Sequence, residues 1–351
     1  MQRFIRNYNS EVFRWTQEGR ISLSVDSFVN NDPAFLKWTD RLKDALSKQQ
    51  MLKFEIGKIR LSLYRPYCKQ FLYFDELLVH RRYQQHHFFP IVTDEIENIA
   101  ICVAGIGDRK GFGCLVASAI PSLDLAFEKA QSFPYYTYAE DGSNRRENIT
   151  DWALAQFQAK YGQEVSKWDI FHYVYAMLHH PQYCERYAEN LKRDLPRIPL
   201  LVGKSEFELC VRIGKRLMEL HVGYEEAMEY PLRWVENRDV PISWHVEKMK
   251  LLPGKDTLVV NEWLTLAGIP QECFAYRLGN RSALEWVIDQ YQVSTDARSG
   301  IVSDPNRLDN EQYIVRLVGK VVTVSVETVK LVKELAQSVN LEEQIVGSEK
   351  A

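Results

Sequence analysis

The chain has 351 residues, of which 46% are apolar and 26% are charged, which is an ordinary composition for a globular protein. Its 44 Lys and Arg residues are balanced by 47 Asp and Glu residues, so the overall charge does not indicate a nucleic-acid partner. No uncharged apolar run approaches the roughly 20 residues that span a bilayer. The first residues lack a signal-peptide core, and the six cysteines are scattered without disulfide or zinc spacing. We therefore expect a cytoplasmic protein in which any basic surface is local.

Strand signals dominate the first part of the chain. One helix is expected before residue 50, opening at Asp32-Pro33 and carrying apolar residues at helical spacing over 35–46. Aromatic and β-branched runs then predict strands at 54–63, 71–74, 99–104 and 115–120. A polar, turn-rich stretch at 140–147 is the expected boundary of this part.

Helical signals dominate after that boundary. Ser166 and Asp169 have the spacing of a capping box in front of an apolar run. Pro181 suits the first turn of a second helix, because proline lacks only an N–H that has no partner there. Ser205 with Glu208 is expected to open a third helix.

The last third of the chain mixes the two signals. Residues 258–260 and 274–278 form a small β-prone island, and helices are expected near 281–291 and 309–339. Residues 321–326 are rich in valine, so propensity alone also allows a strand there.

These signals together predict an α+β fold, with a strand-rich N-terminal half and a mainly helical C-terminal half that carries the small β island. We expect a β-rich mixed domain at 1–145, which is the candidate DNA-reading part, and a mainly helical domain at 146–340. Residues 341–351 are expected to form a disordered tail.

No set of side chains has the spacing of a catalytic or metal site. The histidine pairs at 86–87 and 179–180 lack the i, i+4 spacing that puts two ligands on one helix face. The segment at 203–205 lacks the earlier glycine that a phosphate-binding loop needs. We therefore expect no catalytic residues, no metal and no cofactor in this chain.

One stretch stands out by its local charge. Between residues 53 and 90, seven cations face three acids, and nine aromatic residues are interleaved with them. Cations neutralise phosphates and arginines read guanine edges, although a strand pair with a solvated basic face is the alternative interpretation. With a glycine-rich loop at 104–113, this stretch supplies the candidate DNA-binding residues, which are Arg60, Arg65, Lys69, Arg81, Arg82, Tyr83, Arg109 and Lys110.

Several short segments, spread in order from about residue 7 to residue 335, carry a resemblance to a known family. They are 64–67, 71–74, 105–112, 120–124, 169–175, 178–183, 187–199 and 276–286. Together they resemble the C-terminal region of single-chain, ATP-dependent Type ISP restriction-modification enzymes. In that family one polypeptide resembles a fusion of nuclease, helicase-like translocase, spacer, adenine methyltransferase and target-recognition region, and the resemblance covers only the last part.

The resemblance implies sequence-specific recognition of double-stranded DNA for an attached adenine methyltransferase and restriction enzyme, with the chemistry supplied elsewhere. It implies S-adenosylmethionine, ATP and Mg only for upstream parts. The implied partners are duplex DNA and the methyltransferase and helicase-like parts of the same polypeptide.

The residues themselves leave two alternatives open. In the first, the chain is an interaction module whose apolar helix at 170–178 and basic helix at 186–193 dock onto the translocase and methyltransferase parts. In the second, the chain is a stand-alone nuclease or hydrolase.

Overall fold

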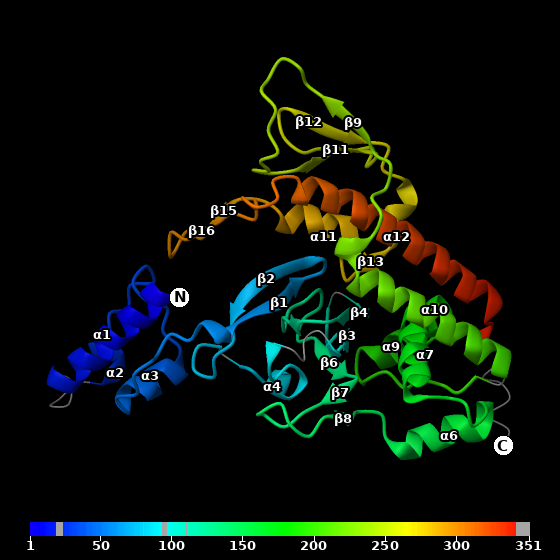
Figure 1. Cartoon of the computed structure of the whole chain (residues 1–351), viewed down its shortest axis with the longest axis horizontal. Helices are drawn as coiled ribbons and strands as arrows, with labels where there is room; N and C mark the ends of the chain where they lie inside the picture. Colours follow the sequence, from blue (N-terminus) through cyan, green and yellow to red (C-terminus); the bar gives the residue numbers. More distant parts are fainter. Residues whose placement is uncertain (19–23, 80, 93–96, 110, 202, 342–351) are drawn as a thin grey trace. The chain divides into compact units, whose positions relative to one another are not determined.

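The computed structural model describes residues 1–18, 24–79, 81–92, 97–109, 111–201 and 203–341 (Figure 1). The chain has an α+β fold, as predicted, with its strands in several small sheets. None of the described helices combines the length and the apolar content that crossing a membrane requires. The predicted tail lies outside the described residues except for Leu341, which is buried.

The chain divides into two compact units. The first unit contains Met1–Ser62, Gln70–His86 and Val293–Asp304, and the second contains Leu63–Lys69, His87–Gln292 and Pro305–Ala351. The division at residues 145 and 146, which was drawn from composition, stays a prediction.

The first unit is built on three short or medium helices. They are α1 (Gln2–Glu18), α2 (Val25–Phe28) and α3 (Asp40–Ser47), and a 3-10 turn, η2 (Ile56–Lys58), precedes strand β1 (Ile59–Arg65). A core cluster that includes Tyr8, Val12, Trp15 and Leu46 forms between the helices. The unit also contains a small hairpin of β15 (Ser294–Thr295) and β16 (Val302–Ser303).

The predicted helix before residue 50 starts later than expected. Helix α3 begins at Asp40, and the Thr39 hydroxyl caps it by accepting the Leu42 N–H at 3.3 Å. Asp32 instead accepts the N–H of Ala34 at 2.9 Å and so closes a local turn. The prediction of a helix start at Asp32-Pro33 was therefore wrong, because this side chain satisfies a turn rather than a helix terminus.

A β-hairpin links the two units along the chain. Strand β1 continues through a turn at Pro66-Tyr67 into β2 (Cys68–Tyr73), and β5 (Ile120–Pro121) completes a three-stranded sheet in the order β2-β1-β5. Tyr67 has a φ of +57°, a left-handed conformation that a bulky residue rarely adopts.

The second unit contains a buried antiparallel sheet. Strands β3 (Ala100–Val103), β4 (Cys114–Ala117) and β6 (Gln131–Pro134) pair in the order β4-β3-β6. Every residue of β3 and β4 is buried, so both faces of these strands are covered. A short pair, β7 (Tyr136–Thr137) and β8 (Arg146–Glu147), follows.

The second unit also contains helices, some of which pack against this sheet. Their bounds are α6 (Asp151–Tyr161), α7 (Lys167–His179), α8 (Pro181–Arg186), α9 (Ala188–Leu191), α10 (Lys204–Val222), α11 (Ala283–Gln290) and α12 (Tyr313–Ser338). Helix α10 packs against α7 and α12, and α12 also packs against α11 (Figure 1). The valine-rich residues 321–326 lie inside α12, where the helical period of their neighbours prevails over their strand propensity.

Of the three helix starts predicted after the boundary at 140–147, two are confirmed. Ser166 and Asp169 form a complete capping box, and Pro181 occupies the first turn of α8. Helix α10 instead begins after Gly203, so Ser205 lies inside its first turn and bonds to the Glu206 carboxylate rather than to a backbone N–H.

The predicted β island is confirmed at residues 258–260, which fall largely in β11 (Thr257–Val259), and its sheet is larger than expected. The other predicted part, 274–278, was wrong in its first half, because residues 274 and 275 end a 3-10 turn and only Arg277–Leu278 are paired as a strand. Strands β9 (Arg233–Glu236), β10 (Lys250–Leu251), β11 (Thr257–Val259) and β12 (Leu264–Ala267) form an antiparallel sheet in the order β10-β11-β12-β9. A 3-10 turn, η4 (Gln271–Ala275), and a tight hairpin of β13 (Arg277–Leu278) and β14 (Arg281–Ser282) lead into α11.

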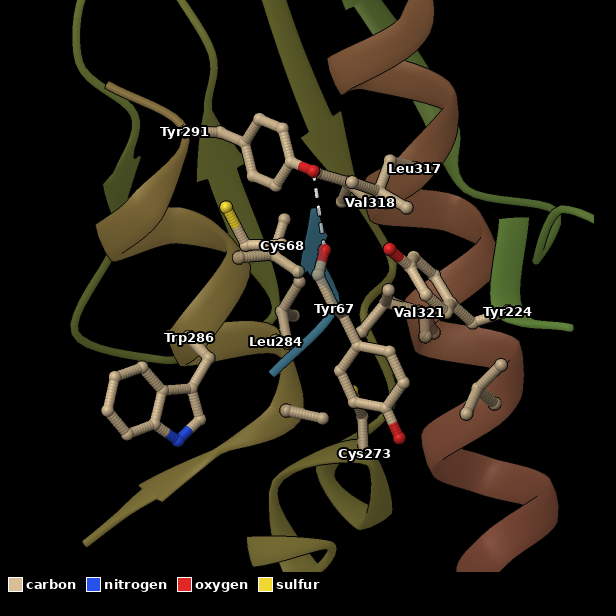
Figure 2. Packing of buried hydrophobic residues seen from close by; sticks show 14 of the residues in the cluster. Tyr67, Cys68, Tyr224, Cys273, Leu284, Trp286, Tyr291, Leu317, Val318 and Val321 are labelled. Carbon is tan, nitrogen blue, oxygen red and sulfur yellow. Dashed lines mark hydrogen bonds between the residues drawn. The ribbon is translucent and has the colours of Figure 1, made fainter. Parts of the chain in front are cut away.

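Figure 2 shows how two segments of the family resemblance meet in the core of the second unit. The Tyr67 hydroxyl donates to the Tyr276 hydroxyl at 3.0 Å, and the Tyr291 hydroxyl donates to the Tyr67 carbonyl at 3.3 Å. The indole N–H of Trp286 donates to the Leu278 carbonyl at 2.9 Å. These aromatic residues therefore hold the fold together rather than face a ligand.

Asn98 is expected to be a stability determinant of the second unit. Its fully buried amide donates to the carbonyls of Phe88 (2.7 Å) and Tyr136 (2.9 Å) and accepts the Tyr136 N–H (3.0 Å). Replacing Asn98 by alanine leaves these backbone groups without partners, at a cost of about 2 kcal/mol in the free energy of unfolding. Urea titration checks this, with Asn148→Ala as a control.

Asn148 is exposed and bonds through its side chain to the Pro134 carbonyl, so its replacement is expected to cost less than about 1 kcal/mol. Equal losses for the two variants would contradict the assignment of Asn98.

Candidate nucleic-acid interface

A depression of about 490 Å³ on the first unit gathers part of the predicted basic stretch. Its lining residues are Asp40, Arg41, Glu76, Arg81, Arg82, Tyr83 and His86. Glu76 lies 3.3 Å from Arg41 and 3.9 Å from Arg82, so it is shared between two guanidinium groups. The lining therefore carries an excess of positive charge.

Arg81 and Tyr83 form the exposed rim of this depression. The Arg81 guanidinium donates to the Tyr83 hydroxyl at 3.3 Å, and no carboxylate of the described residues lies within ion-pair distance of Arg81. Tyr83 is 54% exposed and has a φ of +46°. A left-handed tyrosine is strained, and such strain concentrates at binding sites. These two side chains offer a charge and a flat ring to solvent.

Arg82 and Arg60 both contact the ring of Phe74. Their guanidinium carbons lie 5.9 Å and 5.8 Å from the centre of its ring, within the range of a cation–π contact. Arg60 is only 5% exposed, so it contributes to the packing of the first unit and does not reach the surface. Arg82 is mostly buried but still lines the depression.

Two further predicted residues, Arg65 and Lys69, have internal partners in the second unit. Arg65 donates to the Tyr64 carbonyl at 2.9 Å and lies over the Tyr64 ring. Lys69 forms a 2.5 Å ion pair with Glu225 and lies over the ring of Tyr224. The Lys69 charge is therefore paired within the fold, whereas Arg65 has these local contacts but no ion pair with a carboxylate of the described residues.

Glu225 is a fixed anion at this position. Burial acts to raise its pKa, but hydrogen bonds from Lys69 and Tyr313 outweigh burial and lower the pKa below its usual value. The Lys69 charge is consequently neutralised by a carboxylate that stays ionised.

Arg109 is the exposed member of the glycine-rich loop. Its side chain is 86% exposed, and Nε lies 3.7 Å from Glu128. The loop is fixed by the Gly107 N–H, which donates to the Lys192 carbonyl at 2.9 Å, and by the Asp108 carboxylate, which accepts the Glu128 N–H at 2.7 Å. Lys110 lies outside the described residues.

Of the predicted site residues, the structure thus brings Arg81, Arg82 and Tyr83 together, whereas Arg65, Lys69 and Arg109 belong to the second unit. The sequence did not identify a second basic depression, which includes Lys248, Lys255, Arg277 and Arg281. These cations are dispersed along the sequence among acids, so only the fold reveals that they are neighbours. No group of metal-ligating side chains is present among the described residues.

Solved structures of two restriction-modification enzymes and of DrdV share this fold. A nuclease-deletion mutant of the Type ISP restriction-modification enzyme LlaGI, in complex with a DNA substrate mimic, is 35% identical with a TM-score of 0.83, over 95% of this chain and 30% of that chain. The ATP-dependent Type ISP restriction-modification enzyme LlaBIII, bound to DNA, is 29% identical with a TM-score of 0.81, over 95% and 21% of the chains. DrdV, in a DNA complex, is 34% identical with a TM-score of 0.80, over 94% and 33%.

The chain is thus similar to one segment of each of these relatives and spans about a third or less of their length. The sequence profile of the Type ISP C-terminal specificity domain matches residues 1–317. The chain belongs to this family of specificity domains, as the sequence predicted. The comparison with curated proteins found no match.

Proposed function

We propose that this chain recognises a specific sequence of double-stranded DNA on behalf of a larger restriction-modification enzyme. The observation that carries the proposal is the similarity over 95% of the chain to a Type ISP enzyme in complex with a DNA substrate mimic. The exposed Arg81 and Tyr83 on a basic depression support it, because such groups contact phosphates and bases.

The chemistry in this proposal is carried out elsewhere. The partners are an adenine methyltransferase and a helicase-like translocase in the same polypeptide, and those parts bind S-adenosylmethionine, ATP and Mg. The specificity domain contributes the choice of DNA site and has no reaction of its own.

The interaction-module alternative rests on an apolar helix at 170–178 and a basic helix at 186–193, and the structure argues against the first. The apolar helix that it needs is α7, whose side chains at Ile170, Phe171 and Met177 are buried in the core of the second unit. These side chains are occupied by packing and do not offer a surface to a partner.

Selection from a pool of random duplexes tests the proposal directly. The chain is incubated with the pool, the bound fraction is recovered over several rounds, and the recovered DNA is sequenced. We expect one short motif to be enriched, with affinity for it falling by about 0.9 log units per log unit of salt for each phosphate neutralised. Duplex binding that ignores both salt and sequence, or no binding, contradicts the proposal.

Charge reversal of Arg81 is expected to weaken binding to the enriched duplex about 10-fold, since a base or phosphate contact of this kind is worth on the order of 1–3 kcal/mol. Fluorescence anisotropy titration measures the change. Lys37→Glu is the matched control, because Lys37 is exposed in the same unit, undergoes the same change of charge and does not line the depression. Equal losses for both variants would remove Arg81 from the interface.

A further inference from the structure

A depression of about 600 Å³ lies on the second unit between β10, the β13-β14 hairpin and α11. Its lining residues are Lys248, Met249, Leu251, Lys255, Arg277, Asn280, Arg281, Glu285, Ile288, Asp289 and Gln292. Four of these side chains are cations and two are acids, so the lining carries two positive charges in excess.

The two acids are already paired with two of the cations. Arg281 contacts Asp289 at 2.5 Å, and Lys255 contacts Glu285 at 2.8 Å. Glu285 also accepts the Ser282 N–H at 2.8 Å as part of the capping box of α11. Although burial acts to raise the pKa of Glu285, the hydrogen bond from Lys255 and those from Ser282 lower it. Both acids are thus satisfied.

The excess charge therefore belongs to Lys248 and Arg277. Both side chains are exposed, and no carboxylate of the described residues lies within ion-pair distance of either. Arg277 donates to the carbonyl of Asn280 across the hairpin turn, where Gly279 has a φ of +65°. This bond positions the guanidinium and leaves its charge uncompensated.

The paired cations are held in place by aromatic rings outside the lining. Lys255 lies 4.9 Å from the ring centre of Phe274, and Arg281 lies 5.0 Å from that of Trp286. Lys255 and Arg281 are thus ordered by their acids and these rings, so the cations left to bind an anion are Lys248 and Arg277.

We propose that this depression binds a backbone phosphate of duplex DNA, with Lys248 and Arg277 as the groups that contact it. The inference rests on the proposed function and adds a contact region on the second unit. The arginine fork matches the oxygens of a phosphate. The lining contains no aromatic ring on which a base stacks, so the site favours a phosphodiester over a free nucleotide.

A phosphate contact carries no sequence information, and this property provides the test. The variant Lys248→Glu/Arg277→Glu is titrated with the enriched duplex and with a scrambled duplex of the same length. We expect affinity for both duplexes to fall by the same factor, about 10-fold or more, and the salt slope to decrease by about 2.

Lys215→Glu/Arg238→Glu is the matched control. Both residues are exposed in the second unit and outside the depression, and the variant has the same change of net charge. We expect it to change affinity less than about 3-fold. Lys248→Gln/Arg277→Gln, with thermal unfolding of every variant, separates a lost contact from a lost fold.

The outcomes distinguish the two proposals. Wild-type binding that the depression variants leave unchanged, or reduce only as much as the control does, overturns this inference alone. A loss confined to the enriched duplex also overturns it, because that pattern indicates base contact. Binding of ATP that the variants abolish while duplex binding stays intact assigns the depression to a nucleotide instead. A wild-type chain that binds neither duplex overturns the proposed function and this inference together.

Discussion

Replacing Gly214 by alanine is expected to destabilise the second unit by on the order of 3 kcal/mol or more. Gly214 lies on α10 where this helix packs against α7, and an added Cβ would lie 1.9 Å from the carbonyl oxygen of His172. The obstructing atom belongs to the backbone of α7, so one helix must shift by more than 1 Å within a close-packed core. The better helix propensity of alanine offsets only about 1 kcal/mol of this destabilisation.

Gly319 in α12 provides the control for this prediction. It also lies inside a long helix, but an added Cβ would meet its nearest atom, the Cβ of Glu229, at an ordinary distance of 3.4 Å. Gly319→Ala is therefore expected to leave the free energy of unfolding unchanged or to raise it by up to about 1 kcal/mol. Urea unfolding of both variants measures the contrast, and a Gly214 variant as stable as the wild type would show that α7 and α10 adjust freely.

Acidification from pH 7 to pH 4 is expected to cost the second unit several kcal/mol of unfolding free energy through histidines that are buried or half-buried. His221 is buried, bonds to the Tyr175 hydroxyl at 2.6 Å and the Thr328 hydroxyl at 2.9 Å, and stacks on Tyr276. Burial lowers its pKa well below 6.5, and burial lowers the pKa of His179 to about 4. Burial also lowers the pKa values of His172 and His180.

Stability falls with pH because the unfolded chain binds protons at these histidines more readily than the folded chain does. The unfolded chain protonates these imidazoles below about pH 6.5, whereas the folded chain resists protonation until a lower pH. Their contribution is therefore complete above pH 6.5 and is lost progressively as the pH falls toward the folded pKa values. For His179 alone, the interval from 6.5 to about 4 corresponds to roughly 3 kcal/mol.

Urea unfolding at a series of pH values between 7.5 and 4 measures this loss. His179→Leu is expected to flatten the pH dependence, whatever it does to stability at pH 7, because the slope reports the protons bound. His245→Gln is the control for the loss of a histidine, since His245 is an exposed side chain in the same unit. A wild-type curve that is flat from pH 7 to pH 5 contradicts the prediction.

Local signals in the sequence predicted those elements whose ends are specified by neighbouring residues. The capping box of α7 and the proline that opens α8 are of this kind. Helix α1 was not predicted, although Tyr8, Val12 and Trp15 recur at helical spacing, because no capping residue marks its start. Gly203 rather than Ser205 occupies the N-cap position of α10, and the Ser205 hydroxyl bonds to the Glu206 carboxylate instead.

The candidate site was predictable only where it is contiguous. Arg81, Arg82 and Tyr83 are adjacent in sequence and lie together. The role of Lys69 depends on Glu225, which is 156 positions away, so nothing near Lys69 in the sequence indicates that its charge is neutralised. The burial of Arg60 arises because it lies on a buried face of β1 against Phe74, and that contact requires the tertiary fold.

Because segments of the two units alternate along the sequence, the chain cannot be truncated to one unit, and the first unit cannot finish folding early in synthesis. The first unit receives its last segment, Val293–Asp304, after more than 200 residues of the second unit, and the chain passes between units at positions 62, 69, 86, 292 and 304. No single truncation therefore isolates either unit. During synthesis the first unit acquires its final hairpin only when most of the chain has left the ribosome. The folding of the first unit is therefore completed by contacts between residues far apart in the sequence and not by the formation of its local helices.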